Sequence, residues 1–373
     1  MLVLPLIALY QLHARPSQIG LLGAAVWLPW LIVGRPAGAW VDRLPRRPIM
    51  LVCHGFCAVL FASVPAAWWL GLLTFGHLLV VALGAGTASV FVMTAAQAYL
   101  PTVLAPADLL TGNARLHGSE SATRVAGPGL GGVLVQLLGA VPALLFDALS
   151  FLVALVCLLR IRAREPRREP GPRGAGTTGF VLRDPYLRPI VTYGVLMNLG
   201  LTGYQTIQIV FLAGTLGTGA SVTGMLIAIA GLGGVAGAAL AGPIGRRFGT
   251  ARGILLTQLI TGPFALLGPL AGRGAGLAWY AIGTFVMIGG VVVSNVVLSS
   301  FRQAYTPPHL LGRVLATSMV LVHSSIPLGA LLAGYLGDVA GPRTTMWVMA
   351  ALIAPCGLVL PLSPMRGRRD LPA

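Results

Sequence analysis

The stretch Gly38-Ala-Trp-Val-Asp42-Arg43-Leu-Pro-Arg46-Arg47 places a glycine, a carboxylate and three arginines between two long apolar runs. A degraded copy follows about 200 residues later, as Gly242-Pro-Ile-Gly-Arg246-Arg247-Phe-Gly249-Thr-Ala-Arg252. We call these stretches the first and second signature loops. Because a motif repeated at such an offset is typical of internal duplication, the pair predicts a chain made of two parallel halves.

Composition indicates a membrane protein. Hydrophobic residues make up 56% of the chain, charged residues make up 9%, and the mean hydropathy is +0.86. A water-soluble domain would have too little polar surface with this composition. Eleven apolar stretches are long enough to cross a bilayer as helices. They are Gln18–Val41, Ile49–Leu73, His77–Leu100, Gly112–Leu138, Pro142–Leu159, Arg188–Leu212, Val222–Gly242, Ile254–Ala271, Leu277–Ser300, Val314–Leu336 and Met346–Leu362.

A twelfth apolar piece, Met1 to Leu12, measures about 18 Å as a helix and is too short to cross. We therefore expect the chain to start inside its first transmembrane helix, which is truncated at the N-terminus. Two explanations stay open: a start codon assigned too late, or a real truncation that leaves an impaired carrier. The piece lacks the basic start and the cleavage site of a secretory signal peptide.

The net charge of +16 comes from 25 basic residues, all of them Arg. Most lie in alternate loops, including eight between Arg160 and Arg188, whereas the intervening loops carry one Arg or none. This alternation follows the positive-inside rule and places the Arg-rich loops and the C-terminus in the cytoplasm. The charge therefore indicates topology and contact with anionic lipids, and we expect no nucleic-acid partner.

One long polar segment divides the chain. We predict an N-terminal transmembrane bundle over residues 1–160, a cytoplasmic Arg/Pro/Gly-rich linker over 161–187, a C-terminal bundle over 188–363 and a basic cytoplasmic tail over 364–373. Within the linker, the short amphipathic piece Phe180 to Arg188 is expected to lie on the membrane surface. The pair Gln97 and Pro101 recurs as Gln303 and Pro307, which supports the division into two halves.

The two loops, together with Arg302-Gln303, Pro307 and Gly312-Arg313-Val314, resemble the major facilitator superfamily. The resemblance is to the drug-efflux branch that includes macrolide and enterobactin exporters, and it covers nearly the whole chain. It implies an all-α polytopic membrane protein with two pseudo-symmetric six-helix bundles that work by alternating access. In the first loop, Pro45 stands where that branch usually has glycine or an acidic residue.

The first loop carries the predicted gate. Gly38 removes a side chain where helices pass closely, and Asp42 can accept hydrogen bonds at a helix end. The resemblance implies that this carboxylate latches the bundles in the outward-facing state. Arg43, Arg46 and Arg47 either take part in the gate or only anchor the loop at lipid head groups. Because Arg246 stands at the aspartate position of the second loop, only the first should act as an acidic switch. The resemblance adds Arg302, Gly312 and Arg313 to the gating residues.

A glycine- and proline-rich run in the fifth span resembles the tail of the motif associated with antiporters. It comprises Gly127, Pro128, Gly131 and Gly132, whereas Ala114 and Thr123 occupy the upstream glycine positions. A kink with small residues would let this helix rock against its partner. Ordinary Gly-rich membrane packing is the alternative.

Two acids lie at membrane depth, where charge is costly and usually functional. Glu120 and Arg124 form an i, i+4 couple that either binds a proton and an anionic substrate or is a static bridge. Asp147, about six residues into the sixth span, is a second proton-site candidate, with a wetted helix end as the alternative. Neutral polar groups that either line a cavity or join helices are Asn198, Tyr204, Gln205, Gln208 and Asn295. His323 is expected to be a packing residue.

These observations predict a secondary active transporter, a proton-coupled exporter of a small amphipathic compound in the bacterial inner membrane. An importer of a small metabolite is the alternative, as is a transport-inactive or sensor-like relative. No catalytic cluster, P-loop or repeated pore element is present, so we expect no enzyme and no cofactor. The four Cys lie in apolar spans, so we expect buried thiols and no metal. The expected partners are the substrate, protons and anionic lipids, with the carrier acting as a monomer.

Overall fold

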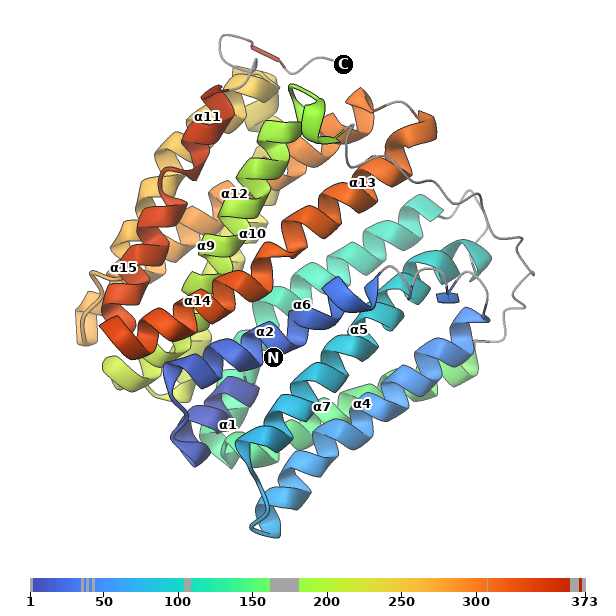
Figure 1. The fold of residues 1–373 in the computed structure, drawn as a ribbon, viewed down its shortest axis with the longest axis vertical. Helices are drawn as coiled ribbons and strands as arrows, with labels where there is room; N and C mark the ends of the chain where they lie inside the picture. Colours follow the sequence, from blue (N-terminus) through green and yellow to red (C-terminus); the bar gives the residue numbers. More distant parts are fainter. Residues whose placement is uncertain are drawn as a thin grey trace. The chain divides into compact units, whose positions relative to one another are not determined.

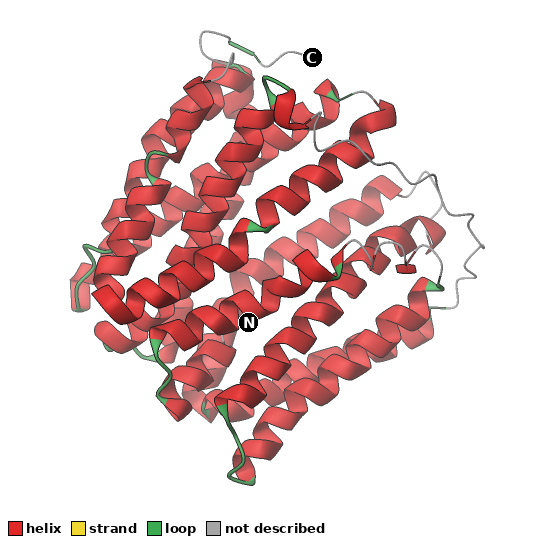
Figure 2. Ribbon diagram, viewed as in Figure 1, coloured by secondary structure: helices red, strands yellow, loops and turns green. Residues whose placement is uncertain are grey.

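The structure is a computed structural model that describes residues 3–34, 37, 40–41, 44–103, 109–161, 181–306, 308–362 and 369–370. Over these ranges the chain is helical with short turns, and no strand occurs among them (Figures 1 and 2). Chain contacts define two compact units. The first comprises Met1–Pro172 with Gly219–Gly224, and the second comprises Arg173–Thr218 with Met225–Ala373.

The first unit is a bundle of long apolar helices. α4 packs along both α5 and α7, and α2 lies against α5. At the α2–α5 crossing, a Cβ on Gly86 would meet the carbonyl oxygen of Val26, so the approach of the two backbones requires glycine. The helices are α1 (Val3–Leu12), α2 (Pro16–Ile32), α4 (Arg46–Trp69), α5 (Phe75–Val103), α6 (Leu109–Leu138) and α7 (Ala140–Arg160).

The second unit is built around α9, which contacts α13, α14 and α15. Its elements are α9 (Leu187–Ile209), the π turn Val210–Thr215, α10 (Ala220–Phe248), α11 (Thr250–Thr261), the 3-10 turns Gly262–Leu267 and Gly274–Gly276, α12 (Leu277–Tyr305), α13 (Pro308–His323), α14 (Ser325–Ala340), α15 (Pro342–Ile353) and the 3-10 turn Cys356–Leu362. A glycine pair brings α10 close to α12, because a Cβ on Gly233 or Gly237 would meet the carbonyl oxygen of Phe285 or Gly289.

Several helices of the second unit are interrupted in the middle of a predicted span. α11 continues as a 3-10 turn, α13 and α14 separate at Ser324, and α15 gives way to a 3-10 turn. Pro263, Pro327 and Pro355 stand inside or beside these three breaks. Proline removes an N–H donor and crowds the preceding turn, which explains why the regular helix stops there.

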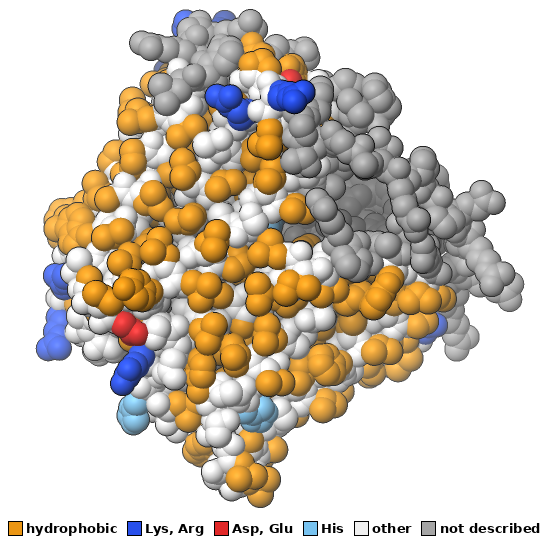
Figure 3. Space-filling model, viewed as in Figure 1, with side chains coloured by type: hydrophobic (Ala, Val, Ile, Leu, Met, Phe, Trp, Pro, Cys, Tyr) orange, Lys and Arg blue, Asp and Glu red, His pale blue; other side chains and the backbone are white. Residues whose placement is uncertain are grey.

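The all-helical fold predicted from the sequence is confirmed. In the part of the chain that the structure describes, nine helices are long and apolar enough to cross a membrane. Three shorter apolar helices, Val3–Leu12, Pro16–Ile32 and Ala126–Leu138, overlap the predicted N-terminal piece and the predicted second and fifth spans. Apolar side chains dominate the described surface between the helix ends (Figure 3). Val52, Trp69 and Leu137 are 71%, 64% and 75% exposed, as expected of helices solvated by lipid.

The piece before α9 packs against the second unit, because the Val181 side chain is fully buried. Its predicted position on the membrane surface stays a prediction. Val181 packs with Leu187, Val191 and Val314 in a hydrophobic cluster at the end of the second unit. Asp184 then accepts hydrogen bonds from the backbone N–H groups of Tyr186 and Leu187, both at 2.8 Å, at the start of the helix. The piece is therefore part of the second bundle.

Candidate transport site and gating loops

The first signature loop joins α2 to α4. Gly38, Asp42 and Arg43 lie outside the described residues, so their predicted roles stay predictions. Pro45 is the residue before α4, and its φ of −59° suits a helix start. Arg46, the first residue of the helix, is only 5% exposed. A guanidinium this buried is held by protein rather than by lipid head groups.

Arg47 fastens the start of α4 to the end of α7. Its Nε donates to the carbonyl oxygen of Leu158 at 3.0 Å, and its Nη2 donates to that of Leu159 at 2.8 Å. These carbonyls belong to the last turn of α7, where the helix dipole favours a cation, and the Leu158 carbonyl oxygen also accepts from the Ile161 N–H at 3.2 Å. Arg47 was expected either to take part in the gate or to anchor the loop at lipid head groups. The contact supports a role within the protein.

A hydrophobic cluster lies under this contact. Val41, Met50, Ala95 and Tyr99 form its buried centre, and Ile161, directly after α7, packs against it. The cluster thereby joins the first signature loop to α4, α5 and the end of α7. Trp40 stacks on Phe91 with ring centroids 5.9 Å apart and ties the loop to α5.

The second signature loop is organised by other residues. Arg246 and Arg247 lie in the last turn of α10, where cations suit the helix C-terminus. Both are exposed, and the Arg247 guanidinium lies 5.6 Å from the centre of the Phe248 ring. Gly249, with φ of +85°, makes the turn into α11. The loop therefore presents cations at its surface.

The glycine run of α6 divides into open and crowded positions. A Cβ on Gly131 would meet nothing within 4 Å, and one on Gly127 would reach only Thr123 at 4.0 Å. A Cβ on Gly132 would lie 2.6 Å from the carbonyl oxygen of Ala220 and 3.0 Å from Cα of Gly224, both in the segment 219–224 of the first unit. Pro128, in the same helix, directs its carbonyl oxygen at Gly224. A larger residue at Gly132 would force these backbones apart.

The ionisable candidates of the first unit are placed on helices α6 and α7. The side chains of Glu120 and Arg124 lie outside the described part, so their pairing stays a prediction. Between them, Thr123 Oγ1 donates to the Ser119 carbonyl oxygen at 2.9 Å, within the same helix. Asp147 is half-buried in α7, two turns after the helix begins at Ala140.

In the second unit, two of the polar candidates join or pack against helices. Gln208 of α9 accepts a hydrogen bond of 2.5 Å from the hydroxyl of Tyr280 in α12. Tyr204 is 1% exposed and lies against Gly268, where a Cβ would collide with its hydroxyl. The Gln208 contact joins two helices, which is one of the two alternatives for that residue, whereas the buried Tyr204 hydroxyl has no hydrogen-bond partner among the described residues.

The remaining polar candidates bond within their own helix or are exposed. Asn198 donates from Nδ2 to the carbonyl oxygen of Gly194 at 2.9 Å, within its own helix. Gln205 of α9 and Asn295 of α12 are exposed. An exposed amide at membrane depth is costly against lipid and suits a wetted surface. His323 ends α13 at the helix break, with Nδ1 2.9 Å from the Met319 carbonyl oxygen.

The structure adds a polar contact that the sequence reading missed. Gln258 of α11 is 1% exposed and donates from Nε2 to the Gly290 carbonyl oxygen at 2.9 Å and to Ser294 Oγ at 2.7 Å. Both acceptors are on α12. A single amide in the apolar run Ile254–Ala271 was the available signal, because a buried amide needs partners on a neighbouring helix.

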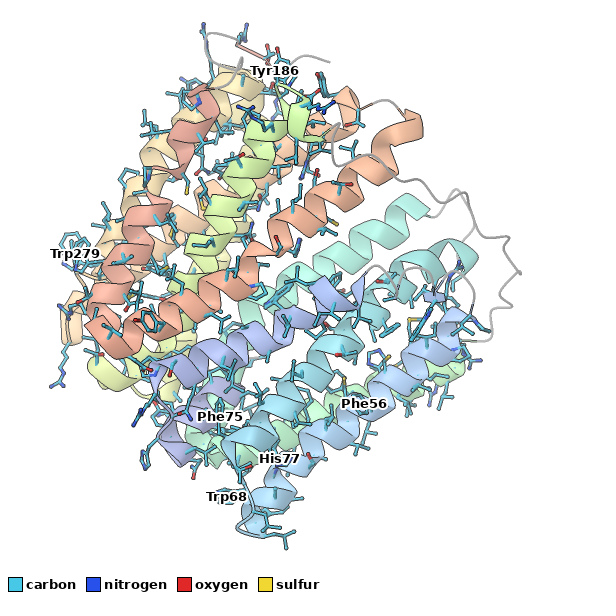
Figure 4. All side chains as sticks on the ribbon, viewed as in Figure 1. Phe56, Trp68, Phe75, His77, Tyr186 and Trp279 are labelled. Atoms are coloured by element: carbon cyan, nitrogen blue, oxygen red, sulfur yellow. The ribbon has the colours of Figure 1, made fainter. Side chains whose placement is uncertain are left out.

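A second group of contacts lies where α12 ends. Tyr305 donates from its hydroxyl to Asp184 Oδ2 at 3.1 Å, and its ring stacks on Phe301 with centroids 5.0 Å apart. Tyr186, labelled in Figure 4, lies at this end of the unit. Its ring packs edge-on against that of Tyr305. Arg302 is half-buried beside them. The side chains of Gly312 and Arg313 in α13 are outside what the structure describes. In the described ranges, no three His, Cys, Asp or Glu residues gather as metal ligands.

Comparisons with known proteins address the family. The profile of the Major Facilitator Superfamily matches residues 1–211 and 194–372. The "Multidrug efflux pump Tap" of Mycobacterium tuberculosis is 27% identical over 388 residues, which cover 97% of this chain and 88% of that protein. The "Uncharacterized MFS-type transporter y4rN" of Sinorhizobium fredii is 27% identical over 377 residues, which cover 97% of this chain and 89% of that protein.

Solved structures agree on the fold. A bacterial homologue of the iron transporter ferroportin, in an inward-facing state, superposes with a TM-score of 0.77 at 17% identity, over 98% of this chain and 93% of that one. The nucleoside transporter NupG gives 0.78 at 11% identity, over 99% and 95%. Likenesses at such identities concern the fold alone. With helices of membrane-spanning length, two signature loops and a family profile matched from end to end, this chain belongs to the Major Facilitator Superfamily and is a multi-pass membrane transporter, not an enzyme.

Proposed function

We propose that this transporter is a proton-coupled exporter of a small amphipathic compound, of drug, macrolide or siderophore type, working by alternating access. The observation that carries the proposal is the similarity to the multidrug efflux pump Tap over 97% of the chain. The other functions considered are import of a small metabolite and a transport-inactive or sensor-like role.

The chemistry of the second unit supports an amphipathic substrate. Gln205 and Asn295 offer exposed neutral amides on two helices, among many apolar neighbours. Neutral hydrogen-bonding groups within an apolar lining bind compounds that have an apolar body and a few polar atoms. The spans of this unit, from Arg188 to Leu362, contain one acidic residue, Asp338, which lies near the end of α14.

Proton coupling is assigned to the first unit. Glu120 and Asp147 are the acids within its predicted spans, and a carboxyl group at membrane depth exchanges protons when it alternates between two aqueous sides. In this proposal Arg124, one helical turn from Glu120, stabilises the ionised carboxylate. Asp42 latches the bundles in the outward-facing state, as it does in the drug-efflux branch that the first loop resembles.

Inverted membrane vesicles test the proposal with ethidium as the probe. An acid-inside pH gradient should drive ethidium into vesicles that contain the protein and not into empty vesicles. Glu120→Gln should abolish the gradient-driven part, Asp147→Asn is the second proton-site variant, and Asp338→Asn is the control acid. Gradient-driven uptake that is unchanged in Glu120→Gln would remove that residue from coupling. No uptake of ethidium or erythromycin by the wild type would reject efflux of this class of compound.

The orientation is proposed with the Arg-rich loops and the C-terminus in the cytoplasm of a bacterial cell, at the inner membrane, with anionic lipids around the arginines and the carrier as a monomer. A C-terminal green fluorescent protein should then fluoresce, whereas alkaline phosphatase at the same place should be inactive. Active phosphatase would reverse the orientation.

A further inference from the structure

Arg369 and Asp370 of the C-terminal tail contact the second signature loop. Thr250 donates from its backbone N–H to Asp370 Oδ1 at 2.9 Å. Ala251 and Arg252 donate from their backbone N–H groups to the carbonyl oxygen of Arg369, at 3.1 and 3.3 Å. The next N–H, of Gly253, already bonds within the helix, to the Gly249 carbonyl oxygen. The tail thus satisfies the three backbone donors at the start of α11 that have no partner inside the helix.

Gly249 is shaped for this contact. Its φ of +85° is a conformation that side chains disfavour, and a Cβ there would collide with the Arg369 carbonyl oxygen. Gly139 and Gly341 precede α7 and α15 with nearly the same backbone angles. A Cβ would meet nothing within 4 Å at Gly341, and only a proline ring at 3.7 Å at Gly139. Of these three matched helix starts, only the one in the second signature loop is closed by a distant segment.

Charge explains why the closing group is acidic. The second loop has Arg246 at the position of Asp42 in the first loop, and it also carries Arg247 and Arg252. Asp370 lies at the N-terminus of α11, the helix end at which an anionic acceptor is favoured. Asp370 is the one acidic residue in the tail.

We propose that Asp370 supplies the acidic group that the second signature loop lacks. The tail is thereby a structural part of the C-terminal bundle that transport requires. Asp370 is then a positioning residue that holds α11 at its turn from α10. The contact itself is independent of the transported compound, whereas its effect on transport rests on the proposed function.

Hydrogen exchange of the whole protein in lipid nanodiscs tests the contact without any substrate. Asp370→Ala, and a chain that ends at Pro364, should raise the exchange rate of the amides of residues 250–252 about 2- to 30-fold, which is the range for loss of a helix cap. Asp370→Asn keeps an acceptor oxygen and should retain most of the protection. Arg369→Ala keeps the backbone acceptor and is the matched control. Gly249→Ala should displace the tail as Asp370→Ala does. Equal protection in the wild type, Asp370→Ala and the shortened chain would overturn the proposal.

Ethidium transport in inverted vesicles tests the positioning role. The maximal rate should fall in Asp370→Ala and in the shortened chain while the KM stays the same, and Asp370→Asn should restore most of the rate. Faster amide exchange with an unchanged rate would confine Asp370 to stability and overturn its role in transport. If the wild type transports neither ethidium nor erythromycin, the proposed function fails, and the exchange experiment still decides whether the tail caps α11.

Discussion

In each unit, hydrogen bonds hold the start of the helix that follows the signature loop. In the first unit the donor is a side chain, because the guanidinium of Arg47 donates to the carbonyl oxygens of Leu158 and Leu159. In the second unit the donors are backbone N–H groups of α11, and the acceptors are Arg369 and Asp370 in the tail. Each contact joins the start of the helix after a signature loop to the segment at the end of its own unit. Each unit therefore has an equivalent connection, made by different chemical groups.

The repeat explains how the chemistry diverged. At the offset that relates Gly38 to Gly242, Arg46 and Arg47 correspond to Thr250 and Ala251. The second unit therefore has no arginine at the position of Arg47. Its tail instead offers a carbonyl oxygen and a carboxylate to the helix N-terminus, which is the partner that a helix start favours. After duplication, the place of a contact can outlast the residues that made it.

The largest effect is expected from copying the first loop into the second. Ala251→Arg should lower the free energy of unfolding by about 3 kcal/mol or more, because Ala251 is 1% exposed and a long charged side chain has no room there. Chemical unfolding in detergent measures the change. Ala251→Ser, which adds one oxygen, is the control and should cost far less. An Ala251→Arg protein as stable as the wild type would mean that the two loops accept the same residues.

Removing the first contact should have the next largest effect. Arg47→Ala should lower the free energy of unfolding by about 2 kcal/mol, because two charge-assisted hydrogen bonds to the end of α7 are lost. Arg47→Lys should lose about half as much, since one ammonium cannot reproduce the two-pronged geometry of guanidinium. The same unfolding experiment measures both variants. If Arg47→Ala leaves the free energy of unfolding unchanged, the contact contributes nothing to stability. Anchoring at lipid head groups would then be the better interpretation of Arg47.

Comparing matched glycines isolates the second contact. Gly249→Ala and Gly341→Ala both force a side chain into a positive φ, which costs about 1–2 kcal/mol in each case. Gly249→Ala must also displace the Arg369 carbonyl oxygen and should cost about 1 kcal/mol more, the value of a helix cap. The difference between the two thermal unfolding midpoints measures this excess. In the chain that ends at Pro364 the excess should disappear, and its persistence there would contradict the tail contact.

Much of the fold followed from local patterns in the sequence, because hydropathy and the charge of loops are local properties. The spans from Ile49 to Leu73 and from Leu277 to Ser300 correspond to α4 and α12. The repeated motif is likewise a local pattern, and it indicates the family without any knowledge of the fold. Pro327 and Pro355 beside the helix breaks are local signals of the same kind.

The partners of single polar residues did not follow from the sequence. Arg47 meets carbonyls 111 and 112 residues away, and Thr250 meets a carboxylate 120 residues away. Such contacts depend on which helix ends the fold brings together, and no periodicity records that. Gln258 was missed for the same reason, since its acceptors on α12 carry no motif of their own.

The smallest effect concerns the far end of the linker, where Tyr305 holds Asp184 as Arg47 holds the end of α7. Burial raises the pKa of the Tyr305 phenol, and the hydrogen bond to Asp184 adds to the rise. The phenol is therefore neutral in the folded state to a higher pH than in the unfolded state. Its contribution is complete below the unfolded pKa of about 10 and is lost as the pH rises through the folded value.

Tyr305→Phe should accordingly cost about 0.5 kcal/mol at pH 7, in the low range for one hydrogen bond near the surface. The stability difference between wild type and Tyr305→Phe should shrink as the pH rises from 9 to 12, measured by denaturant unfolding at each pH. Tyr335→Phe, which alters an exposed tyrosine on α14, is the control variant. A difference that stays constant up to pH 12 would mean that the Tyr305 hydroxyl contributes nothing that ionisation removes, and the linker would then be held at this end by the packing of Val181 and the neighbouring rings alone.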